Sequence, residues 1–226
     1  MTTNFYKLKG VQKFLTNVDN PNVHLHGLEK LPFRLVCVAP SGSGKTNMIL
    51  NLIEKFSKGK GTFNSITIIT RNKGEPLYEY LEEKSEKKVK IEEGLENLPA
   101  MDTFDKDLQH LVVFDDMVLE KNQKVMSEMY IRGRKRGISV CYLSQSFYKI
   151  PKTIRSNCNY FVLLKLSGKR DLNLILSEFE LGVTKQELME MYEDATKEKF
   201  SFLLVDVEAE KEKKFRKNFL ELYTIS

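Results

Sequence analysis

The residues with the clearest chemical meaning are the eight at positions 39–46, Ala-Pro-Ser-Gly-Ser-Gly-Lys-Thr. Glycines at this spacing let backbone N–H groups approach phosphate oxygens without a Cβ in the way. The Lys45 ammonium would reach the β- and γ-phosphates, and the Thr46 hydroxyl would bind Mg²⁺. The pattern therefore predicts a loop that binds ATP and Mg²⁺. Its phosphate-binding residues are Ser41, Gly42, Ser43, Gly44, Lys45 and Thr46.

The first position of this loop departs from the usual pattern, because Ala39 stands where glycine is common. Pro40 follows it, and a residue before proline is restricted to extended dihedrals with negative φ. A Cβ is no obstacle in that conformation. We therefore expect Ala39 to be tolerated.

Two carboxylates, Asp115 and Asp116, follow the apolar run Leu111 to Phe114. An acid at the carboxyl end of a parallel strand lies where such sheets bind ligands. We expect Asp115 to hold Mg²⁺ through water, and Asp116 to turn toward the attacking water. The plainer interpretation is a turn-forming pair, since aspartates often end strands. The phosphate loop upstream favours the catalytic interpretation.

Gln145 follows the next apolar run, Ser139 to Ser144. In one division of P-loop ATPases this strand lies between the phosphate-loop strand and the acidic strand. A polar residue at its end then meets the γ-phosphate, where an amide can both donate to the phosphate and orient the water. By itself, a Ser-Gln-Ser sequence after a strand is equally typical of an ordinary polar turn.

A basic cluster, Arg132, Arg134, Lys135 and Arg136, comes directly before that run and is interrupted by glycine. One interpretation is a helix C-terminus, where the helix dipole favours cations and glycines act as caps. The functional interpretation is an arginine finger that reaches the γ-phosphate of a neighbouring subunit, or a contact to a nucleic-acid backbone. Arg155 is a second candidate for such a role.

Short apolar runs alternate with amphipathic helical patterns, and these elements must position the motifs. The predicted strands are 34–38, 65–70, 111–114, 139–144, 160–166 and 200–205. The predicted helices are 46–56, 77–90, 121–132, 170–179 and 184–195. This alternation indicates an α/β protein with a mostly parallel sheet and helices on both faces. The charged stretch 208–219 is expected to form a solvated terminal helix.

Length and composition fit a globular protein, with 226 residues, 30% charged and 41% hydrophobic. We expect an N-terminal arm over 1–30 and one ATPase domain over 31–226. The net charge of +5 permits a polyanionic partner without requiring one. The three cysteines show no metal-binding spacing, which predicts buried thiols in a protein used inside the cell. No signal sequence or membrane-spanning run is evident.

The chain resembles the viral genome-packaging ATPases of the HerA–FtsK superfamily, which occur in poxviruses, other large DNA viruses and virophages. The resemblance runs from about residue 22 to the end. It rests on PFRLVCVAPSGSGKTNMIL, LVVFDDM, IRGRKRGISVCYLSQSFYKIPKTIRSNCNYF and KFSFLLVDV. It implies a RecA-like domain in a homo-oligomeric ring, a pentamer or a hexamer, that drives double-stranded DNA into a preformed capsid. It also implies the host cytoplasm, a viral factory or the virion as the location, and capsid vertex proteins as partners.

By position, the resemblance assigns Lys45 and Thr46 to the first nucleotide motif, and Asp115 and Asp116 to the second. Gln145 takes the polar sensor position. Arg134 takes that of the arginine that acts on a neighbouring subunit. Asp116 stands where the superfamily has glutamate, one methylene longer, which favours action through a positioned water.

Two alternatives stay open. The first is a monomeric P-loop kinase that phosphorylates a small molecule, which would need a mobile arginine-rich lid; residues 92–108 are poor in arginine. The second is a nucleotide-gated DNA-binding or scaffold protein with little turnover. Gln145 and the acid pair argue against it.

Overall fold

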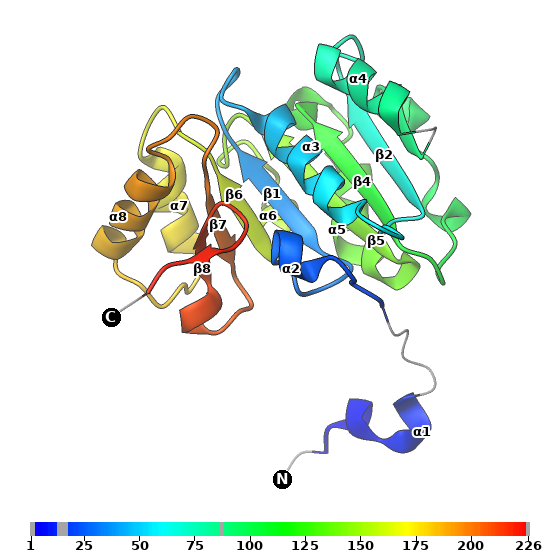
Figure 1. Ribbon diagram of the computed structural model, residues 1–226, viewed down its shortest axis with the longest axis horizontal. Helices are drawn as coiled ribbons and strands as arrows, with labels where there is room; N and C mark the ends of the chain where they lie inside the picture. The colour runs from blue at the N-terminus through cyan, green and yellow to red at the C-terminus, as the bar shows by residue number, and fades with distance from the viewer. Residues whose placement is uncertain (1–2, 13–17, 86–87, 225–226) are drawn as a thin grey trace.

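A computed structural model describes residues 3–12, 18–85 and 88–224 and contains one nine-stranded sheet (Figure 1). The spatial order is β3 (Val89–Glu93), β2 (Ser65–Thr70), β4 (His110–Asp115), β5 (Ile138–Ser144), β1 (Arg34–Val38), β6 (Tyr160–Leu163), β7 (Leu203–Asp206), β8 (Phe215–Lys217) and β9 (Glu221–Leu222). The first six strands run parallel, and the last three pair antiparallel. The predicted mostly parallel α/β sheet is confirmed, with β5 between β1 and β4.

Helices cover both faces of the sheet. One face carries α2 (Val23–His26), α3 (Lys45–Phe56) and α4 (Pro76–Lys84), and the other carries α5 (Gln123–Arg132), α6 (Lys152–Arg155), α7 (Arg170–Glu178) and α8 (Lys185–Ala195) (Figure 1). The remaining helical turns are η1 (Phe5–Lys7), α1 (Lys9–Gln12), η2 (Leu95–Asn97), η3 (Met101–Thr103), η4 (Met117–Leu119), η5 (Gly133–Arg136) and η6 (Lys211–Lys213).

The central strand β1 is apolar at nearly every position because both of its faces are buried. Leu35 and Cys37 pack in the core beneath α3, whereas Val36 and Val38 pack in the core on the opposite face. This arrangement holds β1 rigidly, and the phosphate loop begins at its carboxyl end. We call the edge formed by the C-terminal ends of the parallel strands the carboxyl edge, and the opposite one the amino edge.

The helix predicted over 77–90 is wrong in its second half. The helix α4 ends at Lys84, and the edge strand β3 follows at Val89–Glu93. Val89 and Ile91 are buried while Lys90 between them is exposed. This period-two pattern is that of a half-buried strand, but it is short and lies within a charged stretch.

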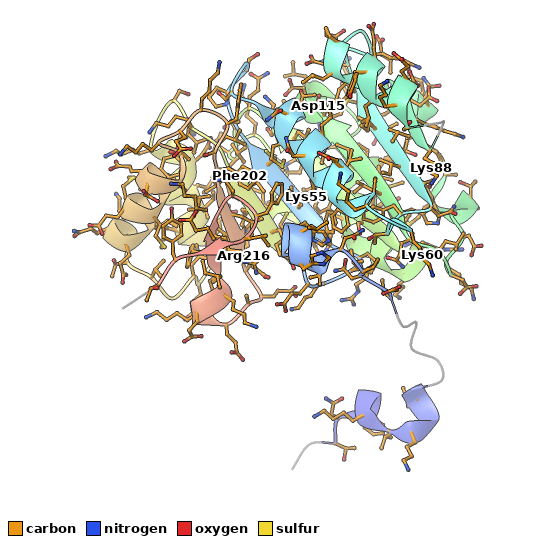
Figure 2. The ribbon with its side chains drawn as sticks, viewed as in Figure 1. Lys55, Lys60, Lys88, Asp115, Phe202 and Arg216 are labelled. Carbon is orange, nitrogen blue, oxygen red and sulfur yellow. The ribbon has the colours of Figure 1, made fainter. Side chains whose placement is uncertain are left out.

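The solvated terminal helix predicted over 208–219 is also wrong. That stretch contains η6 and the strand β8, which pairs with β7 so that Phe215 lies opposite Val205. Phe215 and Arg216 are buried despite the charged residues around them. The Arg216 guanidinium donates to the carbonyl of Gly27 and lies near α2 (Figure 2). A strand forms here because it buries Phe215 and because β8 pairs with the free side of β7.

The segment before β1 packs on the domain. The side-chain amide of Asn22 donates to the carbonyls of Phe56 and Lys58 at 3.0 and 2.9 Å, at the C-terminus of α3. His26 and Leu28 are completely buried. The division into an arm over 1–30 and a domain over 31–226 stays a prediction. These contacts place part of that arm against α3.

The three cysteines, Cys37, Cys141 and Cys158, are free and buried, as predicted. Among the described residues, the longest and most apolar helices fall short of what a membrane crossing requires.

Candidate active site

The phosphate loop turns sharply between β1 and α3 at two glycines. Gly42 and Gly44 have φ of 73° and 100°, a left-handed backbone in which a side chain would be strained. Ala39 is fully buried and is not among the described residues with positive φ, as Pro40 predicts. The Ala39 N–H donates to the Ser144 carbonyl at 3.0 Å, which joins the start of the loop to the end of β5.

Lys45 is only 7% exposed, and its ammonium lies inside the loop. It donates to the carbonyls of Ala39 and Pro40 at 3.1 and 3.4 Å. Both acceptors are neutral, and a phosphate oxygen would be a stronger acceptor for this charge. The ammonium is therefore positioned to bind a phosphate group in the loop.

Asp115 ends β4 at the carboxyl edge and is 8% exposed (Figure 2). Its Oδ2 accepts a hydrogen bond of 2.7 Å from the Tyr78 hydroxyl. Burial raises the pKa of Asp115 to about 6, although the Tyr78 hydrogen bond opposes this rise. Burial raises the pKa of Tyr78, and the nearby Thr46 side chain partly opposes this rise. Tyr78 thus lies close to both expected magnesium ligands, Thr46 and Asp115.

Asp116 follows Asp115 in a left-handed conformation, with φ 54° and ψ 31°. Its Oδ2 accepts a hydrogen bond of 3.3 Å from the Gln145 amide. Its Oδ1 is buried and has no hydrogen-bond partner among the described residues. The left-handed backbone turns the Asp116 carboxylate toward Gln145, and Oδ1 remains an unused hydrogen-bond acceptor.

The residues at this edge fit Mg²⁺. The Thr46 hydroxyl and the Asp115 carboxylate are hard oxygen donors, which this ion prefers. Among the described residues, no group of three or more His, Cys, Asp or Glu side chains could hold a metal by itself. This is the pattern of a site in which substrate phosphates and water complete the coordination of Mg²⁺.

Arg134 lies at the opposite edge of the sheet. It belongs to η5, which precedes β5, whereas Gln145 directly follows that strand. A strand of seven residues spans roughly 20 Å. Arg134 is exposed and lines a cavity with Arg34 and Asn159 at the amino edge. It therefore cannot reach the phosphate loop of its own subunit.

Arg155 has an internal structural role, contrary to its interpretation as a second finger candidate. Its guanidinium pairs with the Glu178 carboxylate through Nε and Nη2. Its Nη1 donates to the carbonyls of Tyr148 and Ile150. These contacts join the loop after Gln145 to α7, and Arg155 is buried.

Sequence reasoning missed Tyr78. It lies in the stretch LYEYLEEK, whose charge suggests a solvated helix face, yet Tyr78 is completely buried. Its position opposite the acid pair results from the pairing of β2 with β4, which aligns Thr70 with Asp115. The available signal was weak: Tyr78 and Leu81 have the i, i+3 spacing of an apolar helix face.

A family model described as the poxvirus A32 protein matches residues 22–215. The chain belongs to this family. The resemblance to viral genome-packaging ATPases is thus confirmed, and this A32-family chain is an ATPase. A comparison with curated protein sequences finds no match.

Several solved structures share the fold of this chain. The DNA-packaging ATPase B204 of Sulfolobus turreted icosahedral virus has a TM-score of 0.61 at 16% identity, covering 83% of this chain and 97% of that one. B204 of Sulfolobus turreted icosahedral virus 2, in complex with AMP, has a TM-score of 0.57 at 14% identity, covering 84% and 98%. The cytoplasmic domain of the type VII secretion ATPase EccC of Thermomonospora curvata has a TM-score of 0.56 at 14% identity, covering 84% and 25%.

Proposed function

We propose that this A32-family chain couples ATP hydrolysis to the translocation of double-stranded DNA, and so packages a viral genome into a preformed capsid. It would act as a homo-oligomeric ring in the host cytoplasm, with capsid vertex proteins as further partners. The single observation that carries the proposal is the hydrogen bond between Asp116 and Gln145, which directly follow β4 and β5, at the carboxyl edge beside the phosphate loop.

The phosphate loop would bind the nucleotide. Backbone N–H groups of residues 41–46 and the N-terminal end of α3 favour a bound anion. The Lys45 ammonium would exchange its carbonyl partners for phosphate oxygens. Thr46 and Asp115 would hold Mg²⁺, which neutralises charge on the β- and γ-phosphates when bound. The Tyr78 hydroxyl would orient the Asp115 carboxylate.

Asp116 and Gln145 would position the water that attacks the γ-phosphate. The hydrogen bond between them orients the Asp116 carboxylate and leaves its Oδ1 unpaired. That oxygen would accept a hydrogen bond from the water when the nucleotide is bound. The Gln145 amide can donate to the phosphate when it gives up that bond. One residue pair could thus detect the phosphate and direct the water.

Arg134 would act on the neighbouring subunit. It is exposed at the amino edge, while the phosphate loop opens at the carboxyl edge. A ring that sets these two edges against each other would bring Arg134 of one copy to the γ-phosphate of the next. Hydrolysis would then depend on assembly, as packaging by a ring requires.

The test is ATP hydrolysis measured against protein concentration, with and without duplex DNA. The rate per subunit should rise as rings form, and duplex DNA should increase it further. The DNA stimulation should fall steeply with salt, because neutralised phosphates release counterions on binding.

Three outcomes would contradict the proposal that this chain is a DNA-translocating ATPase. A rate per subunit that is independent of concentration and of DNA would argue against a ring. Phosphate transfer to a small acceptor in the absence of DNA would indicate a kinase. Tight ATP binding without any product would indicate a nucleotide-gated binding protein.

A further inference from the structure

Phe200 contacts the phosphate loop. It lies in the segment between α8 and β7, and a Cβ placed on Gly44 would be 2.5 Å from Phe200 Cδ1. The strand β7 begins at Leu203, which pairs with Leu163, the last residue of β6. This pairing brings the segment to the carboxyl edge. Glycine at position 44 is therefore favoured by its left-handed backbone, and the Phe200 ring occupies the space that a Cβ would take.

The backbone of Phe200 is strained, and its side chain is only partly exposed. Phe200 has φ of 69° and is 43% exposed. The Ser201 N–H donates to the Glu198 carbonyl at 3.2 Å, so Phe200 is the third residue of a turn. A positive φ at that position favours glycine. Backbone strain of this kind is concentrated at functional sites and ligand clamps.

The residues that follow Phe200 anchor the segment. Phe202 is buried and packs edge-on against Phe219, with ring centroids 5.0 Å apart. The Asn218 N–H donates to the Phe202 carbonyl at 2.8 Å. Phe202 thus belongs to the core, whereas Phe200 projects from a fixed segment. The Lys199 ammonium lies over the Phe200 ring, 4.8 Å from its centroid, and adds positive charge beside the loop.

We propose that Phe200 is the stacking platform for the base of the bound nucleotide. This inference rests on the proposed function, because it needs a nucleoside triphosphate whose phosphates occupy residues 41–46. The ribose and base must then extend along the carboxyl edge, where Phe200 offers an exposed aromatic ring touching that loop. Every nucleobase has a π-face, so stacking tolerates different bases. We therefore expect ATP and GTP to bind with similar affinity.

The first test uses Phe200→Trp. The chain has no tryptophan, so the variant carries a single fluorescent indole at the platform. ATP should change its emission, whereas inorganic tripolyphosphate, which has no base, should not. Tyr80→Trp is the matched control, because Tyr80 lies on α4 and is 57% exposed, in a cavity with Leu50 and Lys88. Its emission should respond to neither ligand.

The second test uses Phe200→Gly, which removes the ring and suits the left-handed turn. Affinity for ATP measured by calorimetry should fall about ten-fold, within the range that alanine substitution finds for base stacking. Affinity for tripolyphosphate should be unchanged, and the thermal midpoint should not fall.

The results separate this inference from the proposed function. Suppose that the wild-type protein binds ATP. If Phe200→Trp then gives no ATP-specific change in emission, or if Phe200→Gly binds ATP with normal affinity, Phe200 is not the stacking platform. Equal loss of affinity for ATP and tripolyphosphate would overturn it too, since Phe200 would then only support the loop. If the wild-type protein binds neither ligand, the proposed function fails.

Discussion

The Tyr78 hydroxyl donates a 2.7 Å hydrogen bond to Asp115 Oδ2 from a helix that is distant in sequence. Burial, and then the Asp115 carboxylate, raise the pKa of Tyr78 well above its usual range, so the phenol keeps its proton and acts as a donor. The Thr46 side chain also lies near this phenol, so Tyr78 is close both to the strand that carries the carboxylate and to the helix that follows the phosphate loop.

Tyr78→Phe should weaken the effect of Mg²⁺ on nucleotide binding. The phenylalanine fills the same space but leaves Asp115 without its orienting donor. We expect the tightening of ATP binding by Mg²⁺ to shrink about five- to ten-fold, the equivalent of a hydrogen bond of roughly 1–1.5 kcal/mol. ATP binding in EDTA should stay unchanged. Calorimetric titrations with and without Mg²⁺ would measure this ratio.

Tyr130→Phe is the control for this experiment. Tyr130 is also completely buried, and its hydroxyl donates to the Leu35 carbonyl at 2.6 Å, away from the site. Tyr130→Phe should lower the free energy of unfolding without changing the effect of Mg²⁺ on ATP binding. An unaltered Mg²⁺ effect in Tyr78→Phe would leave Tyr78 with only a packing role.

Asp115→Asn should stabilise the nucleotide-free protein above pH 6 while abolishing hydrolysis. The folded-state pKa of about 6 exceeds the unfolded value of roughly 3.9. The wild-type carboxyl therefore contributes stability below pH 4, which is lost as the pH rises through 6. At pH 7.5 we expect the variant to be more stable by on the order of 1–3 kcal/mol.

Thermal midpoints of both proteins across pH 4 to 8 would measure this difference. The gap should open between pH 4 and 6 and stay constant above it. A gap of the same size at every pH would mean that the charge on Asp115 is not what destabilises the folded state.

Arg134→Ala should bind ATP yet fail to hydrolyse it, since the proposed finger would act across a subunit boundary. Lys45→Ala should lose turnover because it lacks the ammonium that we propose binds the phosphates. Mixing the two variants should partly restore activity, because some interfaces join an intact Arg134 to an intact Lys45. The neighbouring exposed residue supplies the control, Lys135→Ala, which should stay active. Full activity of Arg134→Ala alone would exclude the finger.

Arg155→Ala should lower stability rather than remove a finger. Arg155 and Glu178 have side chains only 10% and 21% exposed, and removing one partner leaves the other charge poorly solvated. We expect a loss of about 2–4 kcal/mol in the free energy of unfolding. In a double-mutant cycle with Glu178→Ala, the double variant should lose less unfolding free energy than the sum of the two single losses. Additive losses would mean that Arg155 and Glu178 are not coupled.

Much of the site was predictable because its signals are local. The expected phosphate loop is eight consecutive residues, and the groups expected to bind phosphate are the backbone of its glycines and the side chain of its lysine. The short apolar strands were recognisable because burial on both faces leaves them without polar residues. The acid pair and Gln145 could be placed at one edge because each directly follows a strand of a parallel sheet.

The errors came from segments whose structure depends on distant partners. Nothing within 208–219 indicates that Phe215 will pair across from Val205, so its charges suggested solvent. The edge strand β3 forms because β2 offers an unpaired edge, not because its own sequence strongly favours strand.

By itself the sequence determined the nucleotide loop, the parallel α/β class and the family. Only the tertiary structure decided that Tyr78 faces Asp115, that Phe200 touches Gly44, that Arg155 is internal, and that Arg134 lies at the edge opposite the phosphate loop. The reason is physical: dihedral preferences and apolar periodicity act between neighbours in the chain, whereas these contacts depend on how the strands are ordered and which helix lies over them.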